Sequence, residues 1–428
     1  MLDNGLKLLV KTDHRAPVVV SQVWYKVGSS YEHLGKTGLS HMLEHMMFQG
    51  TEHHPAGEFS QIMAVNGAKE NAFTSQDYTA YYQILEKSRL AISFELEADR
   101  MRHLLLSEEE FAKEHKVVLE ERLLRTEDNP NSLLYEYFNA TAFQTSPYQN
   151  PVVGWRNDIE NYQLADLQNW YEQWYAPNNA TVVVVGDVEP QAVFALAQQY
   201  FGELKPSQLT PPNKHEEVKQ LGIKRVIVKR PAKLPYLVMG YKVPVLKTLS
   251  PENYWEAYAL DVLTNILDGG DSARLSRHLM RGQEIATSVY ASYDMTARLT
   301  DLLTFGGVPT ANHSIEELEQ AIKEQIKQLQ TTRVTPEELE RVKIQARSST
   351  VYEKDSLFYQ AMEIGILETV GLNWRLAERY LEKIQTVTPE QIQTVARKYL
   401  IEDNLTVGIL EPLPLNDESD GIFPREVG

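Results

Sequence analysis

Two histidines four residues apart, with a glutamate directly before the second, constrain this 428-residue chain more than any other feature. They lie in the segment His41-Met42-Leu43-Glu44-His45, which apolar residues flank on both sides. On a helix, positions i, i+3 and i+4 share one face, so His41, Glu44 and His45 would point in the same direction. Burying these three groups together is costly unless something pairs with them. The spacing therefore predicts a metal-binding helix rather than a purely structural cluster, and zinc suits imidazole and carboxylate ligands best.

A third protein ligand is expected elsewhere, because catalytic zinc usually takes three and leaves one position open. Glu114 and Glu121 lie seven residues apart, or two helical turns, and so share a helix face with Val117 and Val118. We expect Glu121 to be the third ligand and Glu114 to hold one of the histidines in position. Glu120 would point elsewhere and is expected to be a solvated carboxylate.

The order and spacing of three segments resemble the pitrilysin/insulinase peptidases, most closely their processing-peptidase branch. The segments are Gly38–Thr51, Asn71-Ala72-Phe73-Thr74 and Glu114–Glu121. The resemblance extends over essentially the whole chain, and its His-x-x-Glu-His motif is highly specific.

The resemblance implies a zinc metalloendopeptidase with one Zn²⁺ per chain. In that family the two motif histidines and a glutamate about 75 residues further on bind zinc, and these correspond to His41, His45 and Glu121. The motif glutamate, here Glu44, is the general base. The metal ligands expected from helix geometry and from the resemblance are thus the same.

A hairpin is predicted from residues 71–75 and 79–85, and its first strand matters for substrate. In the resembled family this strand pairs with extended substrate by strand addition. Asn71, Ala72 and Phe73 are then the substrate-binding residues. Without the resemblance, an ordinary edge strand would be the simpler interpretation.

The chain is too long for one ordinary core, and its second half repeats the order of the first. We predict an α+β protein of two homologous α/β-sandwich domains, each a mostly antiparallel sheet covered by helices. The predicted boundaries are 1–204 for the metal domain, 205–222 for a proline-rich linker and 223–428 for the second domain. The counterpart of the metal helix, residues 259–265, carries no ligand set.

Other elements follow from hydrophobic periodicity and from turn residues. One continuous helical region is expected between Glu86 and Asp128. The remaining expected strands are 6–10, 18–25, 180–187, 226–228, 236–241 and 405–410, and the remaining expected helices are 58–64, 165–174, 190–201, 254–267 and 389–399.

A substrate clamp in the second half is incomplete. Self-sufficient members of the resembled family carry an arginine and a tyrosine, seven residues apart, after a glycine-rich turn. Aligned on Ser288-Val289, those positions hold Met280 and Thr287. Arg281 and Tyr290 are the nearest substitutes, at the wrong spacing, although an alignment slip of one or two residues would also explain the mismatch.

The resulting functional hypothesis is a zinc endopeptidase that cleaves extended or unfolded peptides inside a closed chamber. A homologous zinc-free partner chain would supply the Arg/Tyr clamp in a heterodimer, and a homodimer is also possible. A non-catalytic scaffold subunit of the same fold is the alternative. A metal-storage module is disfavoured, because it explains neither Glu44 nor the substrate-like strand.

Charge and composition limit the partners and the compartment. A net charge of −17 argues against nucleic acid and anionic membranes as partners, and no apolar run approaches the length of a membrane-spanning helix. The chain has no cysteine, which fits either redox compartment. No signal peptide is expected, because Met1 is followed at once by family-like sequence. Relatives of this bacterial-looking type are often exported, which favours the periplasm over the cytoplasm for a soluble protein.

Overall fold

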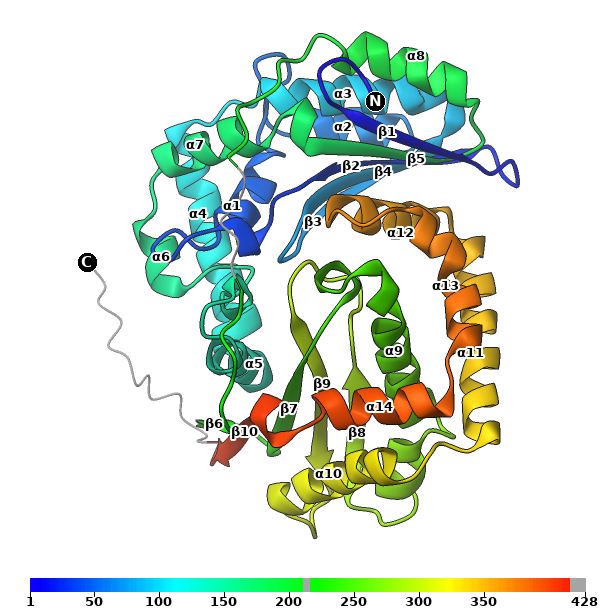
Figure 1. The fold of residues 1–428 in the computed structure, drawn as a ribbon. Coiled ribbons are helices and arrows are strands. Elements are labelled where there is room, and N and C mark those ends of the chain that lie inside the picture. The colour runs from blue at the N-terminus through cyan, green and yellow to red at the C-terminus, as the bar shows by residue number, and fades with distance from the viewer. Residues whose placement is uncertain (211–215, 416–428) are drawn as a thin grey trace, which may run out of the picture.

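The computed structural model describes residues 1–210 and 216–415, and ten strands in that part of the chain form two five-stranded sheets (Figure 1). The strands are β1 (Lys7–Thr12), β2 (Val18–Tyr25), β3 (Lys69–Thr74), β4 (Thr79–Glu86), β5 (Ala180–Gly186), β6 (Lys224–Pro231), β7 (Tyr236–Val243), β8 (Ala286–Ser292), β9 (Asp301–Pro309) and β10 (Leu405–Leu413). The first sheet has the order β1-β5-β2-β4-β3 and the second β6-β10-β7-β9-β8.

The helices among the described residues lie in the connections between these strands. They are α1 (Leu39–Met46), α2 (Glu58–Val65), α3 (Leu90–Arg102), α4 (Glu108–Arg122), α5 (Pro130–Ala142), α6 (Arg156–Asn161), α7 (Leu164–Trp174), α8 (Pro190–Phe201), α9 (Tyr254–Asp268), α10 (Ile315–Thr331), α11 (Pro336–Asp355), α12 (Leu357–Thr369), α13 (Arg375–Thr386) and α14 (Pro389–Tyr399). No helix in the described part of the chain is both long enough and apolar enough to cross a bilayer.

The two sheets have the same topology. In each sheet, the strand that comes first in the chain runs parallel to its neighbour, the strand that comes last: β1 pairs with β5, and β6 pairs with β10. The other neighbouring pairs are antiparallel. The interior strand β5, between β1 and β2, contains four consecutive valines, Val182–Val185, and is buried along its whole length, as a strand covered on both faces requires. The predicted α+β architecture of two homologous, mostly antiparallel sandwich domains is therefore confirmed.

Each sheet has one face covered by helices of its own half. Apolar residues of α1, α3, α7 and α8 form one core with the first sheet, and those of α9, α10 and α14 form another with the second sheet. The helices that carry the metal motif and its counterpart thus occupy equivalent positions, α1 after β2 and α9 after β7.

The opposite face of each sheet is covered by a helix from the other half (Figure 1). Helix α12 packs on β2 and β5, where a Cβ at Gly365 would lie only 2.1 Å from the Trp24 ring, so only glycine allows this approach. Helix α5 packs Leu134 and Phe138 against strands β6, β7 and β10. The two halves therefore share their cores instead of being joined by a linker alone.

A buried polar junction also connects the halves beside the β3–β4 turn. Asp77 in that turn accepts a hydrogen bond from Arg298 Nε at 3.1 Å, and Arg298 Nη2 donates to Ser30 Oγ at 2.7 Å. The Tyr148 hydroxyl donates to the second Asp77 oxygen, and the Arg298 guanidinium lies over the Tyr31 ring at 4.3 Å. This junction fixes the end of the hairpin that contains β3.

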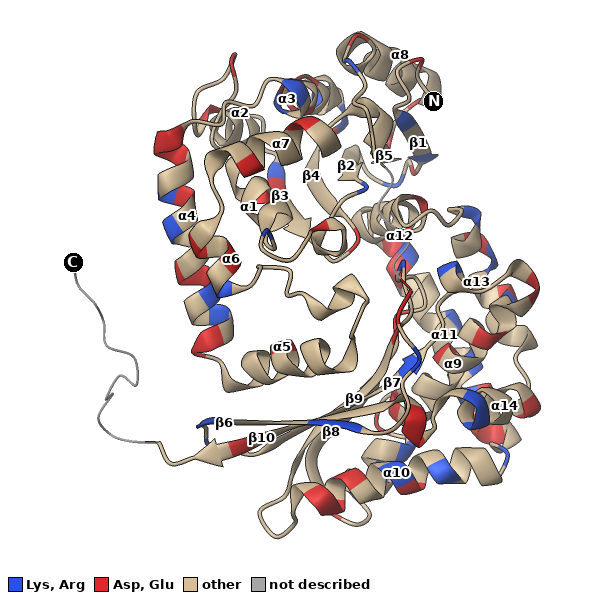
Figure 2. Cartoon of the chain, turned by 60° about the vertical axis from the view of Figure 1, so that its left-hand side comes forward, with Lys and Arg blue, Asp and Glu red and all other residues tan. Residues whose placement is uncertain are grey.

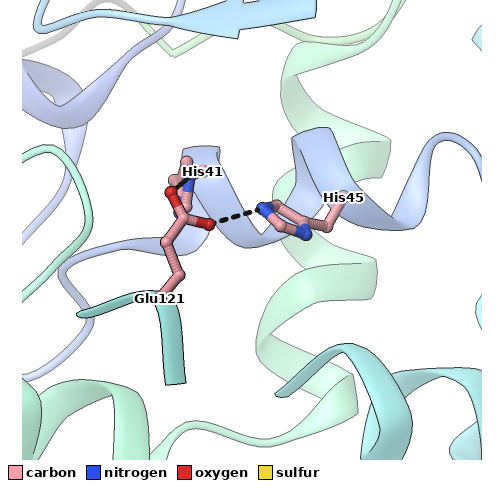
Figure 3. A group of neighbouring side chains, drawn as sticks. All are labelled: His41, His45 and Glu121. Carbon is pink, nitrogen blue, oxygen red and sulfur yellow. Dashed lines mark ion pairs between the residues drawn. The ribbon is translucent and has the colours of Figure 1, made fainter. Parts of the chain in front are cut away.

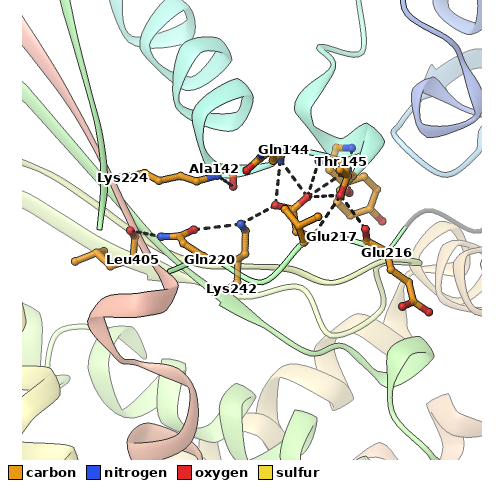
Figure 4. A network of polar contacts seen from close by, with 12 residues as sticks. Ala142, Gln144, Thr145, Glu216, Glu217, Gln220, Lys224, Lys242 and Leu405 are labelled. Carbon is orange, nitrogen blue, oxygen red and sulfur yellow. Dashed lines mark hydrogen bonds and ion pairs between the residues drawn. The ribbon is translucent and has the colours of Figure 1, made fainter. Parts of the chain in front are cut away.

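Residues 216–222 of the predicted linker lie against the second sheet (Figure 4). The Glu217 carboxylate accepts three consecutive backbone N–H groups, of residues 144–146, at 2.9–3.0 Å and pairs with the buried Lys242 Nζ at 2.8 Å. The C-terminal part of the predicted linker is thus bonded both to the loop after α5 and to β7. Residues 211–215 of the predicted linker lie outside the described residues.

The expectation of one helical region from Glu86 to Asp128 is wrong. The chain leaves the helix after Arg102, and Leu104 forms a β-bridge with Thr51 before α4 begins. Ser107 caps the new helix by accepting the Glu110 N–H at 3.2 Å, a Ser-x-x-Glu start signal visible in the sequence. The acidic first turn of α4 suits the positive end of the helix dipole (Figure 2).

Candidate metal centre

Helix α1 is short, and its N-terminus is held by a buried carboxylate. Gly38 precedes it at φ 91°, a conformation that favours glycine. The Glu32 side chain accepts the backbone N–H groups of Gly38 at 2.6 Å and of Ser40 at 2.7 Å, which would otherwise lack partners. Burial raises the pKa of Glu32 to about 7, although these two hydrogen bonds oppose the rise. The helix is fixed in the core by its apolar residues, Leu39, Met42, Leu43 and Met46.

The structure brings His41, His45 and Glu121 together (Figure 3). Glu121 Oε1 lies 3.6 Å from His41 Nε2, and Glu121 Oε2 lies 3.3 Å from His45 Nε2. Burial and the neighbouring His45 lower the pKa of His41 to about 4, so the ring is neutral near pH 7. A neutral imidazole has a free lone pair for a metal.

These separations fit a zinc site. When zinc binds tetrahedrally with ligand bonds of about 2.0–2.1 Å, neighbouring donor atoms lie about 3.3–3.4 Å apart. The two nitrogen–oxygen distances, 3.3 and 3.6 Å, are close to this value. Both are longer than the roughly 2.7–2.9 Å of a charge-assisted hydrogen bond. Each imidazole therefore lies at a distance from the Glu121 carboxylate that suits an ion between them.

Glu114 lies against the far side of His45. Its Oε2 is 3.0 Å from His45 Nδ1, and its Oε1 accepts a hydrogen bond from Gln49 Nε2 at 2.9 Å. This contact favours the tautomer with the proton on Nδ1, which leaves Nε2 free to face Glu121. Glu120 is exposed, as expected, but so is Val117, at 48%, and the shared face of α4 is therefore less apolar than the sequence suggested.

Replacing Glu114 tests this positioning contact. Glu114→Ala removes the acceptor that orients His45, and we expect zinc affinity to fall by about 10–100-fold. Competition with a chromophoric chelator measures the affinity. The matched control is Glu120→Ala on the exposed side of the same helix, which should bind zinc like the unmodified chain. Equal affinities for both variants would contradict the positioning role.

Glu44 lies beside the three donors but is not one of them. Thr74, the last residue of β3, donates its hydroxyl hydrogen to Glu44 Oε2. Burial raises the pKa of Glu44 above its ordinary value. His41, Glu44, Thr74 and Glu121 line one pocket of about 350 Å³. A carboxylate with a raised pKa in this position is suited to exchanging protons with a reacting group.

The predicted substrate strand borders the same pocket. Strand β3 forms the edge of the first sheet, and its one partner strand in the described part of the chain is β4. The Ala72 N–H donates to the Asn71 side chain at 2.8 Å, so this amide points away from β4 toward the open edge. Ala72 packs toward the α1 face, whereas Phe73 packs toward the α12 face.

The structure does not bring the candidate clamp residues to this pocket. Arg281 is exposed after the helical turn Ser276–Met280, and Tyr290 in β8 contacts the Tyr135 hydroxyl of α5. Neither residue lines the pocket that contains His41, nor does any recorded contact among the described residues connect them to it. Among the described residues, the pocket beside the metal donors is therefore lined without either clamp candidate.

The second half has no equivalent of the metal motif. Helix α9, in the position of α1, contains no histidine, and none of its residues belongs to a metal-type cluster in the described part of the chain. Its Asp261 instead accepts the Tyr380 hydroxyl hydrogen at 2.8 Å. Burial raises the pKa of Asp261 to about 6 from an ordinary 3.8.

Asp261 should make stability pH-dependent. Because its folded-state pKa is raised, its favourable contribution is complete below about pH 4 and is lost as the pH rises through about 6. The difference corresponds to roughly 3 kcal/mol at most. Asp261→Asn keeps an acceptor for Tyr380 and should stabilise the protein at pH 8 but not at pH 4, as measured by denaturant unfolding. Equal effects at both pH values would contradict the shifted titration.

Three polar residues at the site were not predicted. Thr74 and Gln49 contact Glu44 and Glu114 through tertiary structure, which no local pattern reveals. Arg125 donates from Nη1 to Glu121 Oε1 at 2.6 Å, and its i+4 spacing on the helix could have indicated the pair.

Comparison with known proteins agrees with this geometry. A family model described as insulinase (peptidase family M16) matches residues 7–155, and one described as the peptidase M16 inactive domain matches residues 161–346. The Helicobacter pylori zinc protease PqqE is 35% identical over 361 residues, which cover 83% of this chain and 79% of that protein. The uncharacterised Bacillus subtilis zinc protease YmxG is 26% identical over 94% of this chain and 95% of its own length.

Structural comparison gives the same answer. The crystal structure of a protease from Helicobacter pylori matches with a TM-score of 0.90 and 31% identity, covering 96% of this chain and 98% of that one. The predicted resemblance to the pitrilysin/insulinase peptidases is thereby confirmed, and the chain belongs to peptidase family M16.

Proposed function

We propose that this chain is a zinc metalloendopeptidase that cleaves extended or unfolded peptides, with one Zn²⁺ held by His41, His45 and Glu121. The observation that carries the proposal is the spacing of these three donors, with Glu44 beside them in the same pocket. The names of the relatives, zinc proteases, support the same metal and the same class of reaction.

The chain's own residues supply the proton transfers. Bound zinc would supply Lewis acidity for the peptide carbonyl and for the attacking water. Glu44 accepts a proton from the attacking water and passes it to the leaving amine. Thr74 holds the Glu44 carboxylate in position by its hydrogen bond.

Substrate would bind as an added strand on β3. Main-chain hydrogen bonds would come from its open edge, where Asn71 must release the Ala72 N–H. Alternate side chains of an added strand point to opposite faces of the sheet. One set would thus face the metal pocket beside Ala72 and Thr74, and the other the apolar surface beside Phe73.

We further propose that a homologous, zinc-free chain completes the site in a heterodimer, with a homodimer as the other outcome. Arg281 and Tyr290 do not reach the pocket here, and a missing oxyanion donor typically costs a few kcal/mol of transition-state stabilisation. Two such chains would enclose a chamber that admits extended peptides and excludes folded proteins.

The test is hydrolysis of an unstructured fluorogenic peptide by the zinc-loaded chain, alone and mixed with a homologous zinc-free subunit. Turnover should disappear with a zinc chelator and return when Zn²⁺ is restored. Turnover by the chain alone would remove the need for the partner. No turnover in either mixture, with zinc bound, would favour the non-catalytic scaffold.

A further inference from the structure

A second group of metal-type donors lies outside the site described above. Asp99 Oδ1 is 2.5 Å from His53 Nδ1 and 3.0 Å from His103 Nδ1, so two imidazoles converge on one carboxylate oxygen. The two rings are 5.0 Å apart and nearly perpendicular, at 88°. The three donor atoms lie within 4.8 Å of one another.

The backbone around this group is held in place before any ion binds. Thr51 donates its hydroxyl hydrogen to the other Asp99 oxygen and accepts the N–H groups of His53 and His54. Thr51 also forms a β-bridge with Leu104, and the Glu52 N–H donates to the His103 carbonyl at 2.9 Å. The loop carrying His53 is therefore fixed over the end of α3, which contains Asp99 and is followed directly by His103.

Charge and access favour a cation here. The side chains of His53 and His103 are 59% and 38% exposed, whereas that of Asp99 is only 10% exposed. Among the described residues, no lysine or arginine forms an ion pair with Asp99, and the carboxylate of Glu52 adds a second negative charge nearby. A divalent ion would neutralise the negative charge of Asp99, which pairs with the two imidazoles.

We propose that His53, Asp99 and His103 form a second site for a divalent transition-metal ion such as Zn²⁺. Imidazole and carboxylate are the ligands such ions prefer. The short His53–Asp99 separation must widen toward about 3.3 Å when an ion replaces the shared proton. The exposed His53 ring is able to make that movement. This site binds more weakly than the one on α1, because two of its three ligands are open to water.

Occupancy would affect the neighbouring centre. The loop that carries Thr51 and His53 continues directly from α1, whose His41 and His45 belong to the first site. An ion between this loop and α3 would connect the end of α1 to a second helix. The proposal rests on the geometry of the loop and of α3, and it stands whether or not the chain is a peptidase.

The experiment is equilibrium dialysis of the purified chain against buffered free Zn²⁺, followed by elemental analysis. The unmodified chain should hold one zinc at low free zinc and two at high free zinc. His53→Asn/His103→Asn should stop at one zinc. His54→Asn is the matched control, because the side chain of the adjacent His54 pairs with Glu58 and lies outside the donor group, and it should still reach two.

A second variant separates the two sites. His41→Asn/His45→Asn should lose the tight zinc and keep the weak one. The proposal is overturned if the unmodified chain saturates at one zinc, or if the second zinc survives in His53→Asn/His103→Asn. Loss of the second zinc in His54→Asn would also overturn it. Circular dichroism identifies any variant that does not fold. If His53→Asn/His103→Asn does not fold, the single variant His53→Asn, at an exposed position, replaces it.

Discussion

Glu44→Gln is expected to lower peptide hydrolysis by about 10²–10⁴-fold, the usual contribution of a general base, while zinc content stays at one per chain. The amide has the size of the carboxylate and still accepts the hydrogen bond from Thr74. It is unable to take a proton from water. Initial rates on the fluorogenic peptide and elemental analysis of the same sample measure both quantities.

Two controls make this result specific to proton transfer. Thr74→Val removes only the hydroxyl that orients Glu44, so its loss of rate should be much smaller and its zinc content unchanged. Glu120→Gln, on the exposed side of α4, should leave the rate unaltered. Retained turnover in Glu44→Gln would exclude Glu44 as the base, and loss of zinc would mean that Glu44 is a ligand.

Arg100→Met is expected to destabilise the protein by about 3–5 kcal/mol, because it leaves a buried carboxylate without its cation. Arg100 is 1% exposed, and its Nε donates to Glu97 Oε2 at 2.9 Å, while Glu97 is fully buried. The guanidinium also lies 4.3 Å from the Phe59 ring centroid and 4.4 Å from that of Tyr81. Urea unfolding monitored by circular dichroism measures the loss.

The double variant Glu97→Gln/Arg100→Met distinguishes charge from packing. Glutamine keeps an acceptor for the Gln83 amide, which now bonds to Glu97 Oε1, but carries no charge. If the unpaired carboxylate causes the loss, the double variant should recover much of it. A double variant as unstable as Arg100→Met would show instead that the lost contacts with the aromatic rings dominate.

Local patterns were sufficient for much of the fold and for the centre of the site. The residues of Val18–Tyr25, rich in valine and aromatic side chains, and the valine run of β5 predicted strands, and both are present. The spacing of His41, Glu44 and His45 predicted one shared helix face. The seven-residue interval between Glu114 and Glu121 placed both carboxylates on one face of another helix. These inferences needed only helix and strand periodicity.

The remaining features depend on contacts between distant segments. The end of α3 near Arg102 follows from the bridge between Leu104 and Thr51, and Thr51 is some fifty residues earlier in the chain. Thr74 reaches Glu44 only because β3 lies beside α1. The sequence periodicity of α5 and α12 did not reveal which sheet each helix covers, because an amphipathic pattern shows that a helix has an apolar face but not where that face packs.

The crossing of α5 and α12 between the two sheets limits how such chains can recombine. A fragment ending at residue 210 would keep α5 without the strands it covers and would leave the Trp24 side of β2 open to water. Exposed apolar surface of that kind promotes aggregation. A chimaera that exchanges one half with a relative must therefore bring a matching partner for both helices. The metal half of this protein is not a portable module, although it contains every expected ligand.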